Sequence, residues 1–334
     1  MNFGATILDA DGLTLSRDEK AFFREANPFG FILFSRNIDT PDQVYGLCSE
    51  FRDAIGRNAP VTIDQEGGRV QRLRAPTWTD WLPPLDFVQK AGDEAERAMY
   101  LRYRYIAHEL YALTIDSNCA PMVDLIVKET HAFLRDRCYG TSVGDLALLG
   151  RAAANGMLDG GVLPVLKHIP GHGRTNLDSH YDLPRVDVSL DTLRETDFAP
   201  FRALNDLPMG MTAHVLYEAI DEVPATLSAD TMALVRNDIG FDGLIMTDDI
   251  GMKALSGTVA QNAARALAAG CDVILHCNAP LADRIACANV AGQMTDAAQT
   301  RAEAALAARQ TPDDIDIADL KAELEALLGG PVHG

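Results

Sequence analysis

Residues 162–180 read VLPVLKHIPGHGRTNLDSH, an apolar run followed by a loop that carries three histidines, two cations and a carboxylate. The run from Val162 to Leu166 is typical of a buried strand, and the glycines and prolines that follow it predict a loop. The loop therefore leaves the strand at its carboxyl end, where α/β folds place their chemistry. From this stretch alone, a metal site, a proton-transfer site and a structural turn all remain open.

Seven further apolar runs alternate with amphipathic helical stretches along the chain. The predicted strands are residues 5–9, 30–35, 61–65, 117–123, 162–168, 210–215, 244–248 and 272–276. The predicted helices are residues 16–26, 41–55, 93–113, 143–158, 190–204, 229–238, 259–269 and 281–293. Strands that alternate with crossover helices form parallel sheets, so the pattern predicts an α/β fold, a single-domain (β/α)8 TIM-type barrel.

The remaining segments fit around this barrel. Residues 295–309 and 315–328 have a helical period and are expected to pack outside it as extra C-terminal helices. Residues 72–86, with Pro83-Pro84, predict a long ordered loop. No linker is visible, so we expect residues 1–334 to form one catalytic domain.

The composition narrows the class of protein. The chain is 47% hydrophobic with a formal net charge of -19, which argues against a nucleic-acid partner. No secretory signal or membrane-length apolar run is present, so we expect no membrane partner and a cytoplasmic location. The six cysteines are scattered and form no CxxC pair, which indicates reduced core residues. We expect a monomer that needs no cofactor and no metal.

Polar residues follow most of the predicted strands at their carboxyl ends. They are Asp64, Gln65, Glu66, Asp124, Lys167, His168, His214, Asp248 and Asp249. In a barrel these strand ends meet on the face that carries the active site. Each residue alone is more often a solvated strand end, but the shared pattern indicates a site.

Two positions predict a mechanism. Asp248 ends a buried strand, where a carboxylate can attack an electrophilic carbon; its structural alternative is to cap the next helix. Asp178 precedes His180 by two residues, close enough to bond the imidazole and favour its charged form. This pair predicts a general acid/base.

Four segments together resemble a known family. Residues 167–173 (KHIPGHG) and 178–180 (DSH) resemble the KHFPGHG…DSH signature of the β-N-acetylhexosaminidases of glycoside hydrolase family 3. Residues 64–72 (DQEGGRVQR), 136–140 (DRCYG) and 247–252 (TDDIGM) resemble that family's DQEGGRVxR, DRxFG and (S/T)DDLxM segments.

The resemblance implies residue roles and a substrate. Asp248 would be the nucleophile of a retaining double displacement, and His180, paired with Asp178, the acid/base. The sugar would be held by Asp64, Arg72, Arg137, Lys167 and His168. The implied activity is exo-β-N-acetylglucosaminidase action on peptidoglycan fragments during cell-wall recycling, with a small carbohydrate as the substrate. The roles of His172 and His214 stay open.

Several alternatives also remain. Phosphate could resolve the intermediate, which would make the protein a phosphorylase. His168, His172, His180 and Asp178 could instead bind a metal for hydrolysis, although their spacing matches no ligand motif. A Schiff-base enzyme built on Lys167 would need a lowered lysine pKa. A sugar-binding protein without catalysis would have little use for a nucleophile and an acid together.

Overall fold

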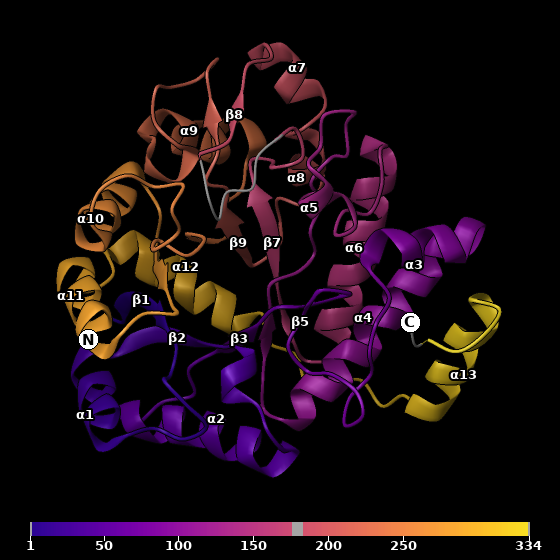
Figure 1. Cartoon of the computed structure of the whole chain (residues 1–334), viewed down its shortest axis with the longest axis horizontal. Helices are drawn as coiled ribbons and strands as arrows, with labels where there is room; N and C mark the ends of the chain where they lie inside the picture. The colour runs from indigo at the N-terminus through magenta and orange to yellow at the C-terminus, as the bar shows by residue number, and fades with distance from the viewer. Residues whose placement is uncertain (1, 176–182, 333–334) are drawn as a thin grey trace.

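Eight parallel strands form a barrel at the centre of the computed structural model, which describes residues 2–175 and 183–332 (Figure 1). The strands are β1 (Gly4–Leu8), β2 (Pro28–Leu33), β3 (Val61–Ile63), β6 (Ser117–Asn118), β7 (Leu163–Ile169), β9 (Met209–Thr212), β11 (Leu244–Met246) and β12 (Ile274–His276). Their order around the sheet is β11-β9-β7-β6-β3-β2-β1-β12. A parallel bridge between Met246 of β11 and Val273, the residue before β12, brings the two end strands together and closes the barrel. The predicted (β/α)8 barrel is therefore confirmed, with a strand in each predicted place.

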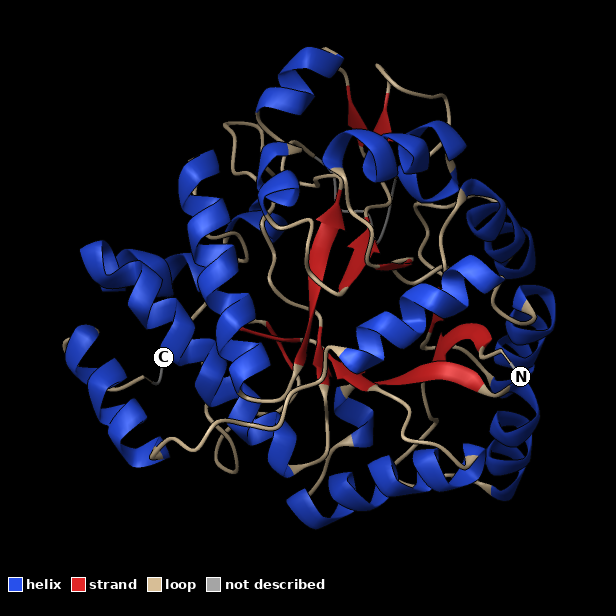
Figure 2. Cartoon of the chain, turned by 180° about the vertical axis from the view of Figure 1, so that it is seen from behind, coloured by secondary structure: helices blue, strands red, loops and turns tan. Residues whose placement is uncertain are grey.

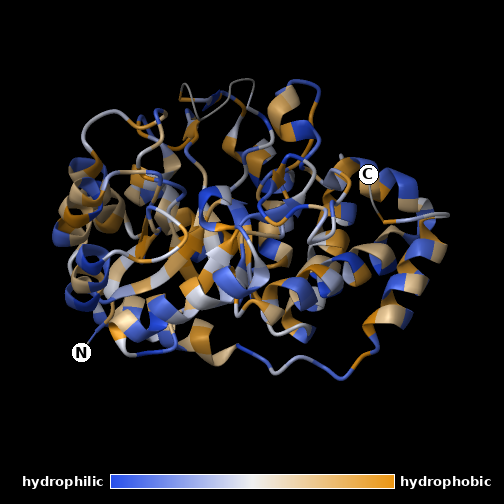
Figure 3. Cartoon of the chain, turned by 60° about the horizontal axis from the view of Figure 1, so that its bottom comes forward, coloured by the Kyte–Doolittle hydropathy of each residue, from blue (hydrophilic) through white to orange (hydrophobic). Residues whose placement is uncertain are grey.

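Helices surround the strands (Figure 2). They are α1 (Arg17–Ala26), α2 (Pro41–Ile55), α3 (Pro84–Ala91), α4 (Ala95–Ala112), α5 (Ala132–Arg135), α6 (Val143–Asp159), α7 (Leu190–Glu195), α8 (Ala199–Ala203), α9 (Ala229–Leu234), α10 (Val259–Ala269), α11 (Leu281–Ala291), α12 (Asp296–Ala307) and α13 (Ile317–Leu327). They carry hydrophilic and hydrophobic residues in alternation, as expected of helices with one face on a barrel (Figure 3).

Local signals set several helix ends as predicted. The Ser16 side chain accepts from the Glu19 main chain, and the Glu19 side chain accepts from the Ser16 main chain, which completes a capping box before α1. Helix α2 begins at Pro41 after the Thr40 cap and ends at Ile55, followed by Gly56, whose φ of 69° is left-handed. These ends depend on a few neighbouring residues, which is why they can be predicted.

Three predicted segments are wrong in detail. The helix expected over residues 190–204 is divided into α7 and α8, because Pro200 in the first turn of α8 lacks the N–H that a continuous helix needs. Residues 229–238 begin as α9, but residues 235–239 widen into a π-helix. The loop expected over residues 72–86 ends early, because Pro84 starts α3; proline is tolerated at that position of a helix.

The last two helices lie outside the barrel. Helix α12 contacts β11, and the chain then crosses to place α13 against α4, on the right of Figure 1. Arg97 of α4 holds Glu323 of α13, with Nε and Oε1 2.7 Å apart. That residues 1–334 form one catalytic domain stays a prediction.

Two further observations bear on the class of protein. All six cysteines are buried and unpaired, as predicted. Within residues 2–175 and 183–332, no helix has both the length and the apolar character needed to cross a membrane.

Candidate active site

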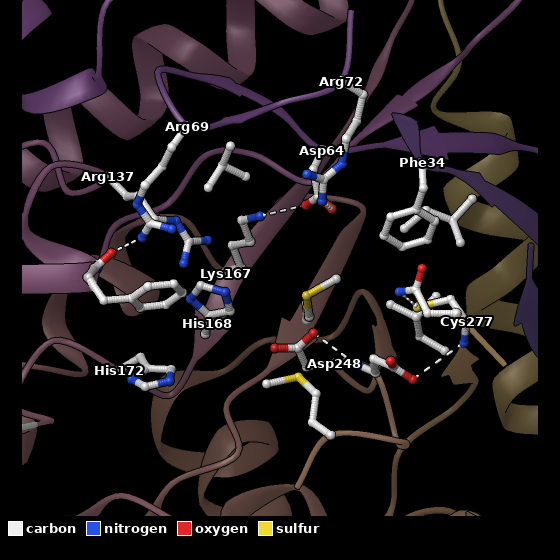
Figure 4. A pocket seen from close by; sticks show the side chains of 18 residues that line it. Phe34, Asp64, Arg69, Arg72, Arg137, Lys167, His168, His172, Asp248 and Cys277 are labelled. Atoms are coloured by element: carbon white, nitrogen blue, oxygen red, sulfur yellow. Dashed lines mark hydrogen bonds and ion pairs between the residues drawn. The ribbon is translucent and has the colours of Figure 1, made fainter. Parts of the chain in front are cut away.

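A cavity of about 260 Å³ opens at the carboxyl ends of the barrel strands (Figure 4). Six of the predicted site residues line it: Asp64, Arg72, Arg137, Lys167, His168 and Asp248. They come from segments that follow β3, β5 (Val70–Gln71), α5 and β11, and from β7 itself. The barrel therefore brings together residues that are far apart in the sequence. The other two predicted residues, Asp178 and His180, lie outside the described part of the chain.

Glu66 is the centre of the charged group in this cavity, although it was only one of several strand-end candidates. Its carboxylate accepts two bonds from Arg137, Nε to Oε2 at 2.9 Å and Nη2 to Oε1 at 2.7 Å. The Lys167 ammonium lies 2.6 Å from the same Oε1. Burial raises the pKa of Glu66, but Arg137 and Lys167 lower it by more, to about 2. Glu66 therefore fixes two cations that line the cavity.

Asp64 holds the other side of the same group. Its Oδ1 accepts from Lys167 Nζ at 3.1 Å, and its Oδ2 accepts from Arg72 Nη2 at 2.9 Å. Burial raises the pKa of Asp64, but Lys167 and Arg72 hold it well below its usual range. Burial lowers the pKa of Lys167, but Glu66 and Asp64 raise it above its ordinary value. A lysine held in its charged form is opposite to what a Schiff-base enzyme requires, so the structure disfavours that alternative.

Asp124 positions the two histidines of the β7 segment. Its Oδ2 lies 2.7 Å from His168 Nδ1, and its Oδ1 accepts from the main-chain N–H of His172 at 2.6 Å. The carboxylate favours the tautomer of His168 that carries hydrogen on Nδ1. The ring of His172 contacts Thr175 Oγ1 at 2.9 Å, and burial together with the neighbouring His168 lowers the pKa of His172 to about 4. His172 is therefore neutral, and Asp124 is a second positioning carboxylate.

Asp248 faces the cavity from the end of β11 (Figure 4). Its Oδ1 accepts from the main-chain N–H of Asp249 at 2.8 Å. Burial raises the pKa of Asp248, but the imidazoles of His214 and His168, that N–H and Lys167 lower it by more. The side chain is therefore an ionised carboxylate, the form that a nucleophile needs.

His214 contacts the residue that follows Asp248 and is fully buried. Its Nδ1 contacts Thr226 Oγ1 at 2.7 Å, and its Nε2 lies 3.0 Å from the main-chain oxygen of Asp249. These contacts connect the segment after β9 to the residue next to Asp248. His214 is thus placed to position its neighbours.

Aromatic rings form part of the cavity wall. Phe34 lies on one side in Figure 4, and the Arg72 guanidinium lies 5.2 Å from its ring centroid. Phe133 lines the cavity beside Arg69 and Arg137, with the Arg69 guanidinium 3.9 Å from the ring centroid. Such rings offer flat apolar faces beside charged groups, a combination that suits a ligand with both kinds of surface.

The metal hypothesis finds no support in the part of the chain that the structure covers. Among residues 2–175 and 183–332, no three His, Cys, Asp or Glu side chains are grouped so that they could hold a metal ion. Asp178 and His180, which that hypothesis also used, lie outside this part. The described residues of the cavity instead supply an ionised carboxylate, fixed cations and an imidazole, which suit the binding and attack of a polar, uncharged substrate.

The chain is similar to known proteins of one family. The model of the family "Glycosyl hydrolase family 3 N terminal domain" matches residues 8–309. A β-hexosaminidase from Methylococcus capsulatus is 35% identical over 312 residues, which are 92% of this chain and 92% of that protein.

Solved structures give the same result. NagZ from Neisseria gonorrhoeae superposes with a TM-score of 0.83 at 29% identity, over 98% of this chain and 97% of NagZ. The same NagZ was also solved with N-trifluoroacetyl-D-glucosamine. A β-N-acetylglucosaminidase of this family from Paenibacillus sp. str. FPU-7 gives a TM-score of 0.84 at 31% identity, covering 97% of this chain, which spans 66% of that longer protein. The chain therefore belongs to glycosyl hydrolase family 3, a family of glycosidases.

Proposed function

We propose that the protein is a retaining exo-β-N-acetylglucosaminidase that removes terminal N-acetylglucosamine from peptidoglycan fragments. The observation that carries this proposal is the ionised Asp248 carboxylate, which shares one cavity with the group of Asp64, Lys167 and His168. A carboxylate can attack the anomeric carbon of a sugar, and fixed donors and acceptors can hold its hydroxyls and acetamide. The gonococcal NagZ that binds a glucosamine derivative supports the choice of sugar.

The reaction would proceed in two displacements. Asp248 would attack the anomeric carbon while His180, held by Asp178, protonates the departing oxygen; this breaks the glycosidic bond and forms a glycosyl-enzyme. His180 would then take a proton from water, which attacks the same carbon and releases Asp248. An imidazole with an ordinary pKa of about 6.5 can serve both steps near neutral pH.

The residues that bind the sugar would be Asp64, Arg72, Arg137, Lys167 and His168. Three of these are cations fixed by the carboxylates of Asp64 and Glu66. Their positions are therefore set before substrate arrives, which lowers the entropy lost on binding.

The proposed substrate is N-acetylglucosamine in β-1,4 linkage to 1,6-anhydro-N-acetylmuramic acid, with or without the stem peptide. On this proposal, the protein acts in cell-wall recycling as a cytoplasmic monomer. The names of the cited relatives support a hexosaminidase, and none of them names a phosphorylase. We therefore propose that water is the acceptor.

The test is Asp248→Ala assayed on an aryl N-acetylglucosaminide and on anhydro-muropeptides. We expect hydrolysis to be abolished in the variant, and the wild-type protein to release the β-anomer of the sugar, followed by NMR. Full activity in the variant, or initial release of the α-anomer, would contradict the proposed role of Asp248.

A further inference from the structure

A buried imidazole lies next to the cavity without being part of its wall. His276 ends β12 and is 2% exposed, whereas its neighbours Leu275 and Cys277 line the cavity. Because successive side chains of a strand point to opposite faces, His276 points away from the cavity, toward the helices that surround the barrel. Neither ring nitrogen forms a hydrogen bond with any residue that the structure describes. Burying such groups is costly, so their surroundings call for an explanation.

The ring of His276 faces the Asp249 carboxylate. His276 Nδ1 lies 3.5 Å from Asp249 Oδ1. The same oxygen accepts from the main-chain N–H groups of Gly251 at 3.0 Å and Cys277 at 3.4 Å. Gly251 lies beside the same two groups, since a Cβ at that position would lie 3.3 Å from Asp249 Oδ1 and 3.4 Å from the imidazole. The Asp249 side chain is therefore held between the segment after β11 and the end of β12.

The main chain of Asp249 connects this contact to the proposed nucleophile. Its N–H donates to Asp248 Oδ1 at 2.8 Å. Its carbonyl oxygen lies 3.0 Å from His214 Nε2. Asp249 is thus fixed by His214 on its main chain and contacted by His276 on its side chain, while its own N–H orients the Asp248 carboxylate.

We propose that His276 is a positioning residue that acts through Asp249 to orient the carboxylate of Asp248. This inference rests on the proposed role of Asp248 as nucleophile. The group that would hold the sugar is built on the segments around β3 and β7, and among the described residues His276 forms no hydrogen bond or ion pair with that group. Misplacing the nucleophile should therefore slow the chemical step and leave binding intact.

The experiment compares two variants of His276 with one control. His276→Leu removes the imidazole at similar volume, whereas His276→Asn returns an N–H close to the place of Nδ1. Ile274→Val changes packing two residues earlier on the same face of β12. With 4-nitrophenyl N-acetylglucosaminide, we expect kcat of His276→Leu to fall roughly tenfold with KM within about twofold of wild type. His276→Asn should recover most of the loss, and Ile274→Val should behave as wild type.

Further measurements separate the proposal from its alternatives. The double variant Asp249→Asn/His276→Leu should lose no more activity than the worse single variant, because both changes break one contact. A wild-type kcat in His276→Leu, a loss confined to KM, or no recovery in His276→Asn would overturn the proposal. If His276→Leu fails to fold, the comparison of His276→Asn with His276→Gln decides, because only Asn places its amide near Nδ1.

Asp248→Ala is measured in parallel. Activity in that variant would contradict both the proposed function and this inference. If Asp248→Ala is inactive and His276→Leu is fully active, only this inference is contradicted.

Discussion

Replacing Glu66 with Gln should weaken the fold and the proposed sugar site together. Glu66 is 1% exposed and accepts from Arg137 at 2.7 and 2.9 Å, with Lys167 at 2.6 Å. Gln has the shape of a protonated Glu, so it removes the charge while keeping the volume. Its amide N–H would also face two cations that can only donate.

The size of the effect follows from the pKa of Glu66, which is about 2 instead of the ordinary 4.5. At roughly 1.4 kcal/mol for each tenfold change in proton affinity, this difference corresponds to about 3 kcal/mol of stability at neutral pH. The range of about 3–5 kcal/mol for breaking a buried ion pair agrees with it. We therefore expect Glu66→Gln to lower Tm by roughly 5 °C.

The contribution of Glu66 to stability should depend on pH. A carboxyl whose pKa is lowered by folding stabilises the protein above its unfolded pKa and loses that contribution as pH falls through its folded pKa. For Glu66 the contribution is present above pH 4.5 and disappears toward pH 2. In Glu66→Gln, the loss of Tm between those pH values should be shallower than in wild type.

The assay is thermal unfolding across this pH range, together with kcat/KM on an aryl N-acetylglucosaminide at neutral pH. We expect kcat/KM to fall roughly 10- to 100-fold because Arg137 and Lys167 lose a shared anchor. Glu109→Gln is the matched control. Burial, the largest influence, raises the pKa of Glu109, and its Oε1 accepts hydrogen bonds from the main chain and hydroxyl of Thr79 instead of pairing with a cation. That variant should keep or raise Tm. An unchanged Tm and an unchanged acid profile in Glu66→Gln would refute the reasoning.

Four further outcomes are expected. His180→Ala should slow substrates with poor leaving groups far more than activated aryl glycosides, because only the former need a proton; equal losses across an aryl series would count against an acid role. Asp124→Asn should lower kcat/KM roughly tenfold because His168 Nδ1 loses the carboxylate 2.7 Å away, while Asp145→Asn, an exposed change on α6, should have no effect. Exhaustive chelation should leave hydrolysis unchanged, and phosphate should yield no sugar 1-phosphate; loss of activity that a metal restores, or formation of that product, would favour the alternatives.

Local patterns in the sequence determined much of the fold. Helices α2 and α10 begin and end where predicted, because Thr40 and Thr258 cap their starts and Gly56 and Gly270 end them. The eight apolar runs predicted the strands, since each run needs only its own residues to be recognised. The sequence did not predict that the helix expected at residues 190–204 is divided in two. The helical period of its apolar residues continues through Pro200, but a continuous helix cannot include a proline at that position without losing a main-chain hydrogen bond.

The sequence also determined which residues lie at the strand ends, because the carboxyl ends of parallel strands meet on one face of a barrel. That rule alone places Asp64, Lys167 and Asp248 in one cavity. Only the tertiary structure decided how they are connected: Glu66 pairs with Arg137, 71 residues away, and Asp124 contacts His168, 44 residues away. Such contacts depend on closure of the barrel, which no local pattern encodes, and closure also sets the burial and neighbouring charges that keep Asp248 ionised.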